Sequence, residues 1–226
     1  MWGEKLIVAI PTMYLSHLEP IFDNYKAIDL THVEKIIVFN NSEKVYRSPF
    51  EKIFIVNLGQ NIGVNPAWNH ALLIAKAGKK DLMLLNDDVM FNSDFFTKTH
   101  EALEDNRQFA VVCPETSKTR GDFYGGPSQY ISRRYTSMRR RVGWAFTINR
   151  DFVKNIPLMP ESMTIFFGDD WIWHFTDQKW VKDNSNLIFH SIGKTTRKHK
   201  DLRARYRSDK QIFTFMLEKI KNENTG

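Results

Sequence analysis

Two pairs of adjacent carboxylates are the residues in this 226-residue sequence that are best suited to chemistry. Asp87 and Asp88 come shortly after an apolar run at 82–85, and Asp169 and Asp170 follow a glycine. Adjacent carboxylates repel each other unless a positive charge lies beside them, and Mg²⁺ or Mn²⁺ binds carboxylate and phosphate oxygens together. The first pair therefore predicts a divalent-cation site for a phosphate-bearing ligand, with a solvent-exposed acidic turn as the alternative.

The second pair, Asp169 and Asp170, suits acid–base chemistry. A carboxylate can take the proton from an attacking hydroxyl group when it lies within hydrogen-bond reach. The alternative is structural, because acidic side chains also stabilise the N-terminus of a helix, which could begin here at Trp171. The sequence leaves both interpretations open.

The elements around these carboxylates predict an α/β fold with a mainly parallel sheet of the nucleotide-binding type. Strands are expected at 5–12, 35–39, 52–58, 82–86, 109–113, 142–149 and 187–190. Helices are expected at 16–28 with Ser16 as the N-cap, at 65–77 with Asn65 as the N-cap, at 93–105 with Ser93 as the N-cap, and at 208–221; a long loop is expected at 116–135. In open α/β sheets ligands bind at the carboxyl ends of the strands, which is where Asp87 and Asp88 fall.

The composition is that of a folded globular protein with one cysteine. Hydrophobic residues make up 42% of the chain. Cys113 lies in an apolar run and is expected in the core. Because it is the only cysteine in the sequence, no internal disulfide can form, which suits a reducing compartment. We find no signal peptide and no apolar run long enough for a membrane span, so a cytoplasmic protein is expected, in the host cytoplasm if a phage encodes it.

The net charge of +6 is unevenly distributed. Residues 131–141 contain five arginines and no acid, and residues 194–210 contain eight lysines or arginines and two aspartates. Such asymmetry indicates a polyanionic partner or a phosphate-bearing substrate, with an ordinary solvated basic face as the alternative.

Six short motifs occur in an order that resembles the family 2 glycosyltransferases with the GT-A fold, particularly their small soluble rhamnosyltransferase-like members. The motifs are Pro11-Thr12, the segment 61–69, Leu85-Asn86-Asp87-Asp88, Gly143-Trp144-Ala145-Phe146, the segment 167–171 and the segment 190–196. The resemblance covers roughly residues 5 to 200. It implies one domain over 1–226, with a nucleotide-sugar-binding half at 1–115, an acceptor-binding and catalytic half at 116–207, and a C-terminal helix at 208–226.

The resemblance also implies roles for individual residues. Asp88 matches the last, metal-ligating acid of the Asp-x-Asp motif, whose first acid is Asn86 here, and His190 matches a late histidine that completes a Mn²⁺ or Mg²⁺ site. Asp170, with Asp169 before it, matches the catalytic base. The residues expected to bind the donor are Pro11, Thr12, Asn40, Asn41, Asn61, Asn65, Asn86, Asp87, Lys194, Thr195 and Arg197, and those expected to bind the acceptor are Tyr124, Arg139, Arg140, Gly143 and Trp144.

The function implied is metal-dependent, inverting transfer of a sugar from a nucleotide-diphosphate sugar to an acceptor hydroxyl. The acceptor stays open between a hydroxymethylated base in DNA, as for some phage glycosyltransferases, and a surface polysaccharide or lipid-linked glycan. A non-catalytic nucleic-acid-binding module on the same scaffold is an alternative of another class. A nucleotidyltransferase would normally have a glycine- and lysine-rich loop after the first strand, and Pro11-Thr12-Met13-Tyr14 is not such a loop.

Overall fold

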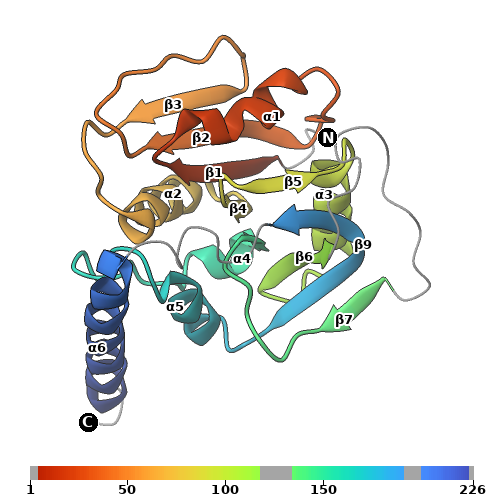
Figure 1. The fold of residues 1–226 in the computed structure, drawn as a ribbon. Coiled ribbons are helices and arrows are strands. Elements are labelled where there is room, and N and C mark those ends of the chain that lie inside the picture. The colour runs from red at the N-terminus through yellow and green to blue at the C-terminus, as the bar shows by residue number, and fades with distance from the viewer. Residues whose placement is uncertain (1–4, 118–133, 191–199, 224–226) are drawn as a thin grey trace.

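The computed structural model describes residues 5–117, 134–190 and 200–223, and its centre is one sheet of nine strands between two layers of helices (Figure 1). The strands are β1 (Leu6–Thr12), β2 (Val33–Asn40), β3 (Ile53–Asn57), β4 (Leu82–Leu85), β5 (Val89–Phe91), β6 (Val111–Ser117), β7 (Tyr135–Ser137), β8 (Ala145–Ile148) and β9 (Trp180–His190). Their order is β3-β2-β1-β4-β8-β6-β9-β5, and β7 pairs with β9. Both halves of the chain therefore contribute to a single sheet.

The sheet is parallel in its first half and mixed in its second. Strands β3, β2, β1 and β4 are all parallel neighbours. Strand β8 runs antiparallel to both β4 and β6, β5 and β7 run antiparallel to β9, and β6 is parallel to β9. The predicted α/β class is correct, and the antiparallel strands could not be recognised because a strand buried on both faces has the same apolar pattern in either direction.

Seven helical elements were found in the described residues: the 3₁₀ helix η1 (Leu15–Leu18) and the α-helices α1 (Glu19–Asp23), α2 (Val64–Gly78), α3 (Phe95–Asp105), α4 (Arg150–Val153), α5 (Gly168–Phe175) and α6 (Lys200–Glu223). Helices α2, α4 and α5 pack on one face of the sheet, with α6 against the outer side of α5 and the turn before it, while η1, α1 and α3 pack on the other face. Alternate residues of β1 serve the two faces: Ile7 and Ala9 face α2, and Val8 and Ile10 face the opposite layer. Cys113 is buried in the core as predicted.

Several predicted boundaries are wrong for identifiable reasons. The helix expected at 16–28 is two short pieces, η1 and α1, with Pro20 in the first turn of α1 and no side-chain cap from Ser16. Helix α2 begins at Val64 after Gly63, whose φ of +93° suits glycine, so Asn65 lies inside the helix and does not cap it. Asp94, and not Ser93, precedes α3.

Three further elements differ from the expectation. The strand expected at 187–190 begins at Trp180, and its polar residues Asp183, Ser185 and Asn186 are buried. Strand β7 lies at the end of the predicted long loop. Helix α6 starts at Lys200, eight residues before the expected boundary. Within the described residues, none of the helices combines the length and the hydropathy that a membrane crossing needs.

Candidate active site

Polar side chains from several strands meet at one edge of the sheet. Thr12, at the end of β1, is in register with Asn40 at the end of β2, and Asn40 is in register with Asn57 at the end of β3. Asn86 follows β4 directly, and its backbone N–H donates to the carbonyl oxygen of Trp144 at 2.8 Å. Parallel strands place their carboxyl ends together, and β8, being antiparallel to β4, brings its start to the same edge.

Asp88 and His190 are adjacent at this edge. The Nε2 of His190 lies 3.1 Å from Oδ1 of Asp88, and pairing of β5 with β9 sets Val89 opposite His190. The His190 side chain is only 9% exposed and stacks on Trp144, with ring centroids 5.3 Å apart. The indole N–H of Trp144 donates to the Thr116 hydroxyl at 3.1 Å. Packing thus fixes the histidine ring next to the Asp88 carboxylate.

Asp87 faces a different set of partners. The hydroxyl of Thr12 donates to Oδ2 of Asp87 at 2.6 Å, and Nδ1 of His17 lies 3.1 Å from the same oxygen. Burial raises the pKa of Asp87, and the contacts with Thr12 and His17 oppose that shift. Asp87 and Asp88 therefore point to separate partners, the first toward β1 and η1 and the second toward β9.

Asp169 and Asp170 lie in the first turn of α5 and share one cation. Nε of Arg141 is 3.3 Å from Oδ2 of Asp169, and Nη2 of Arg141 donates to Oδ2 of Asp170 at 2.5 Å. Burial and the neighbouring Asp170 raise the pKa of Asp169, and Arg141 opposes this. A Cβ atom at Gly143 would lie 2.9 Å from Oδ2 of Asp169, so the missing side chain leaves room for this carboxylate beside the start of β8.

The segment 163–168, which leads into Asp169, is fixed from two sides. On one side Nδ2 of Asn65 donates to the carbonyl oxygens of Met163 and Phe166 at 3.0 and 2.9 Å. On the other side the buried carboxylate of Asp209, on α6, accepts from the backbone N–H groups of residues 164, 165 and 166. Asn65 is therefore a framework residue of the acidic pair in this structure.

Phe167 holds the most unusual backbone conformation of this segment. Its φ is +64°, which is uncommon for a side chain of this size. The ring stacks on Phe213 at 5.4 Å and lies 5.1 Å from the ring of Tyr206, both on α6. Helix α6 thus supports the turn from which α5 and its two aspartates start.

We expect Gly168→Ala to destabilise the protein by about 1 to 3 kcal/mol, because overpacking a tight interior has this cost. A Cβ at this position would lie 2.2 Å from Oδ1 of Asn65 and 2.9 Å from the Trp68 ring. The matched control is Gly78→Ala at the end of α2, where the new Cβ would meet only Cγ of Lys80 at 3.2 Å. Urea unfolding should show a loss for the first variant and little change or a gain for the second; equal stabilities would contradict the tight packing at Gly168.

The remaining residues expected at the donor have varied environments. Nδ2 of Asn40 donates to the carbonyl oxygen of Lys44 and to Oδ1 of Asn57, and its Oδ1 accepts from the Ser42 hydroxyl, so this side chain is engaged within the fold. Oδ1 of Asn41 accepts from the backbone N–H of Ile62 at 3.1 Å. Asn61 is exposed, with Oδ1 accepting from Gly63 N–H, and Pro11 is buried in β1.

The residues expected at the acceptor are partly within the described chain. Gly143 and Trp144 lie beside the acidic pair and His190, as set out above, and Arg139 and Arg140 are exposed on the bend that leads to Arg141. Tyr124, Lys194, Thr195 and Arg197 lie outside the described residues.

Sequence analysis missed two side chains that this edge brings to the carboxylates. His17 contacts Asp87, and Arg141 contacts both Asp169 and Asp170. Arg141 belonged to a recognisable arginine run, although nothing in the run indicates which member meets the acids. Nothing in the sequence indicated that His17 contacts a carboxylate, because it lies in the segment where one long helix was expected.

Asp88 and His190 could together supply two ligands to a divalent cation whose remaining ligands come from a bound phosphate compound. Among the residues described, no group of three or more His, Cys, Asp or Glu side chains is arranged to hold a metal. One carboxylate and one imidazole are both normal ligands of Mn²⁺, and Mg²⁺ or Mn²⁺ is commonly bound by one or two protein groups together with substrate phosphates. The pair thus suits a cation that arrives with a diphosphate.

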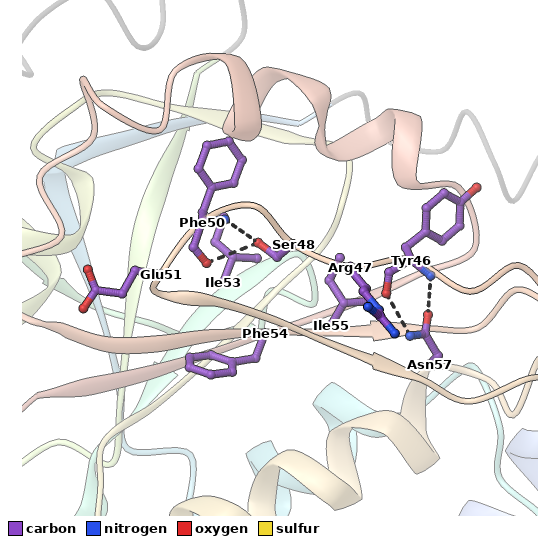
Figure 2. Close-up of a pocket in the computed structure, with 9 residues that line it drawn as sticks. All are labelled: Tyr46, Arg47, Ser48, Phe50, Glu51, Ile53, Phe54, Ile55 and Asn57. Carbon is purple, nitrogen blue, oxygen red and sulfur yellow. Dashed lines mark hydrogen bonds between the residues drawn. The ribbon is translucent and has the colours of Figure 1, made fainter.

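A separate hollow of about 450 Å³ lies at the edge strand β3 (Figure 2). Tyr46, Arg47 and Phe54 are among its lining residues, and Asn57 joins it to the strand ends by exchanging two hydrogen bonds with the backbone of Tyr46. None of the carboxylates described above lines this hollow. We assign it no role in the site.

Comparison with known proteins gives a match in structure and not in sequence. No family model matches the chain, and no curated protein sequence is significantly similar to it. The mannosyltransferase PcManGT from Pyrobaculum calidifontis, solved with GDP-Man and Mn²⁺, is 15% identical and superposes with a TM-score of 0.61 over 95% of this chain and 64% of that one. Residues 1–349 of S. aureus TarS, solved with UDP-GlcNAc, are 13% identical, with a TM-score of 0.56 over 90% of this chain and 64% of that one.

These similarities establish the fold. Both neighbours are GT-A glycosyltransferases, so the chain has a GT-A-type α/β fold, as the order of its motifs predicted. The chain covers less than two thirds of the length of either neighbour. Activity, donor and acceptor of this protein are therefore matters for a proposal.

Proposed function

We propose that this protein is a glycosyltransferase that moves a sugar from a nucleotide-diphosphate sugar to a hydroxyl group of an acceptor. The observation that carries the proposal is the meeting of two acidic sites at one edge of a GT-A sheet. Asp88 with His190 lies on one side, Asp169 with Asp170 lies on the other, and Trp144 and Gly143 connect them. A donor site and an acceptor site need this arrangement, because the reacting atoms have to meet between them.

In the proposed reaction the acceptor oxygen attacks the anomeric carbon and the bond from that carbon to the diphosphate oxygen breaks. Asp170 takes the proton of the acceptor hydroxyl, with Asp169 beside it. One base and one leaving group give a direct displacement, so the configuration at the anomeric carbon is inverted. Asp88 and His190 would hold a Mn²⁺ or Mg²⁺ ion, which supplies positive charge to the departing diphosphate when it is bound.

The donor would lie along the strand ends. Thr12, Asn41, Asn61, Asn86 and Asp87 are placed at this edge or on the loops that leave it. Donor complexes with UDP-GlcNAc and GDP-Man are known for the two structural neighbours, and they support a nucleotide sugar as the ligand class here.

A DNA base that carries a hydroxymethyl group is our first candidate for the acceptor. The feature that favours it is the basic bend of Arg139, Arg140 and Arg141 directly beside the acidic pair. Phosphodiester backbones are attracted by such clusters. This acceptor would place the protein in the cytoplasm; a polysaccharide or lipid-linked glycan is the other acceptor to test.

The experiment that tests the proposed function is a thermal-shift panel of UDP-, GDP-, dTDP- and CMP-linked sugars, each with and without Mn²⁺. A ligand that binds only the native state raises the melting temperature, and the shift grows with its concentration. We expect at least one nucleotide sugar to stabilise the protein, and to do so more strongly with Mn²⁺. If no nucleotide sugar gives a shift under either condition, the proposed activity is wrong.

A further inference from the structure

Arg141 touches both acids with only part of its guanidinium group. The contact with Asp169 uses Nε, and the contact with Asp170 uses Nη2. A guanidinium has five N–H donors in a planar fork, and among the described residues Nη1 and the second N–H of Nη2 have no hydrogen-bond partner. The side chain is 37% exposed. A second anion can therefore reach Arg141 while the first edge stays on the acids.

The charge around Arg141 favours an anion despite the two carboxylates. Arg139 and Arg140 are exposed on the same bend, and neither forms an ion pair with another described residue. The three arginines of this bend and the two aspartates that Arg141 contacts together carry a net charge of +1.

A second basic surface lies next to the same turn. Arg205 and Arg207 are exposed on α6 and flank Tyr206, whose ring contacts Phe167 two residues before Asp169. A small phosphorylated acceptor would need only one of these surfaces. A long phosphodiester chain would use both, and nucleic acid is a chain of this kind.

We propose that the outer edge of Arg141 binds a backbone phosphate of a nucleic-acid acceptor and thereby sets the distance from that phosphate to Asp170. The proposal rests on the proposed glycosyl transfer and adds a specificity-determining residue to it. One edge of the guanidinium holds the acid pair and the other holds the phosphate in a bidentate contact. The hydroxyl that reaches Asp170 must then lie close to a phosphate, which a neutral glycan does not provide.

The test uses the full chain and a fluorescein-labelled 20-base-pair DNA duplex, with anisotropy measured at several salt concentrations. We expect Arg141→Gln to weaken binding by about tenfold, since a bidentate charge-assisted contact is lost. The slope of log affinity against log salt concentration should also become shallower by about 1 in this variant, which corresponds to the loss of one phosphate contact. The matched control is Arg47→Gln, which removes the same charge from an exposed residue at the β3 edge and should change affinity less than twofold.

Further variants separate a phosphate site from a folding effect. Asp169→Asn with Asp170→Asn should keep or increase DNA affinity, because Arg141 remains and two negative charges are gone. If Arg141→Gln does not fold, Arg141→Gln with Asp169→Asn restores the charge balance and is measured in its place. Equal affinities of the Arg141 and Arg47 variants, or a loss of binding in the double aspartate variant, would overturn the proposal.

DNA anisotropy, combined with the thermal-shift panel of nucleotide sugars, distinguishes failure of this inference from failure of the proposed function. DNA binding that depends on Arg141, combined with no response to any nucleotide sugar, would support the phosphate site and reject glycosyl transfer. A Mn²⁺-dependent response to a nucleotide sugar, combined with DNA binding that ignores Arg141, would reject the phosphate site and leave glycosyl transfer standing.

Discussion

Asp170→Asn should leave the nucleotide sugar bound with unchanged affinity and reduce sugar transfer by about a hundredfold or more. A positioned general base contributes on the order of 10² to 10⁴ in rate, and an amide cannot take the proton of the acceptor hydroxyl. Asn keeps the size of the side chain and can still receive the N–H of Arg141, so the contact at Oδ2 is retained in form. The measurements are single-turnover transfer and donor affinity on the same preparation.

The control for this variant is Asp177→Asn, two residues after α5 ends. The Asp177 side chain is 81% exposed, and its φ of +51° is well suited to asparagine. Its transfer rate should match that of the unmodified protein. If Asp170→Asn keeps more than a tenth of the rate while Asp169→Asn loses it, Asp169 is the base and the assignment within the pair is reversed.

The order of strands and helices could be predicted because each carries its own local signal. The buried strands β1, β2 and β4 are apolar runs, and α2 has an amphipathic face with glycine at both ends. The short strands β5 and β7 have three residues each and gave no signal, since they exist only through pairing with β9. Likewise β9 contains a polar run at 182–186, and the burial of its members Asp183, Ser185 and Asn186 depends on neighbours distant in the sequence.

The candidate site was predictable in its carboxylates and in the pairing of Asp88 with His190, and not in the partners of the other three acids. Asp87, Asp88, Asp169 and Asp170 stood out as acids next to apolar segments. The contacts with His17 and Arg141 join residues that are 70 and 29 positions apart, for Asp87 and Asp170 respectively, so only the tertiary structure reveals them. The role of Asp209 is of the same kind, because an aspartate within a basic helix is normally a surface residue.

Asn65 shows how one residue can satisfy a motif for a structural reason. Its position before Pro66 suggested a helix cap and a place in the donor pocket. In the structure Asn65 does not cap the helix, and its amide holds the backbone of the segment before Asp169. Asn65 therefore connects helix α2, in the first half of the chain, to the segment that carries the acidic pair. This contact joins residues about 100 positions apart, so the sequence does not reveal it.

Asp88→Ala should abolish the Mn²⁺-dependent part of donor binding, a loss on the order of a hundredfold in affinity at saturating Mn²⁺. The change removes a carboxylate that lies 3.1 Å from His190 and leaves the imidazole as the one protein ligand of the pair. A lone neutral imidazole holds Mn²⁺ or Mg²⁺ weakly, since these ions prefer oxygen ligands. Titration of the donor by calorimetry, with Mn²⁺ and with EDTA, measures the effect directly.

Asp87→Asn is the informative comparison, because Asp87 is the neighbouring acid and contacts Thr12 and His17 instead of His190. This variant should bind the donor somewhat more weakly, while the ratio of donor affinity in Mn²⁺ to donor affinity in EDTA stays unchanged. Asp88→Ala should bring that ratio close to one. If the two variants lose the same share of the Mn²⁺ effect, both carboxylates hold the ion; if Asp88→Ala leaves the ratio intact, the cation is bound elsewhere and the assignment of Asp88 and His190 as its ligands is wrong.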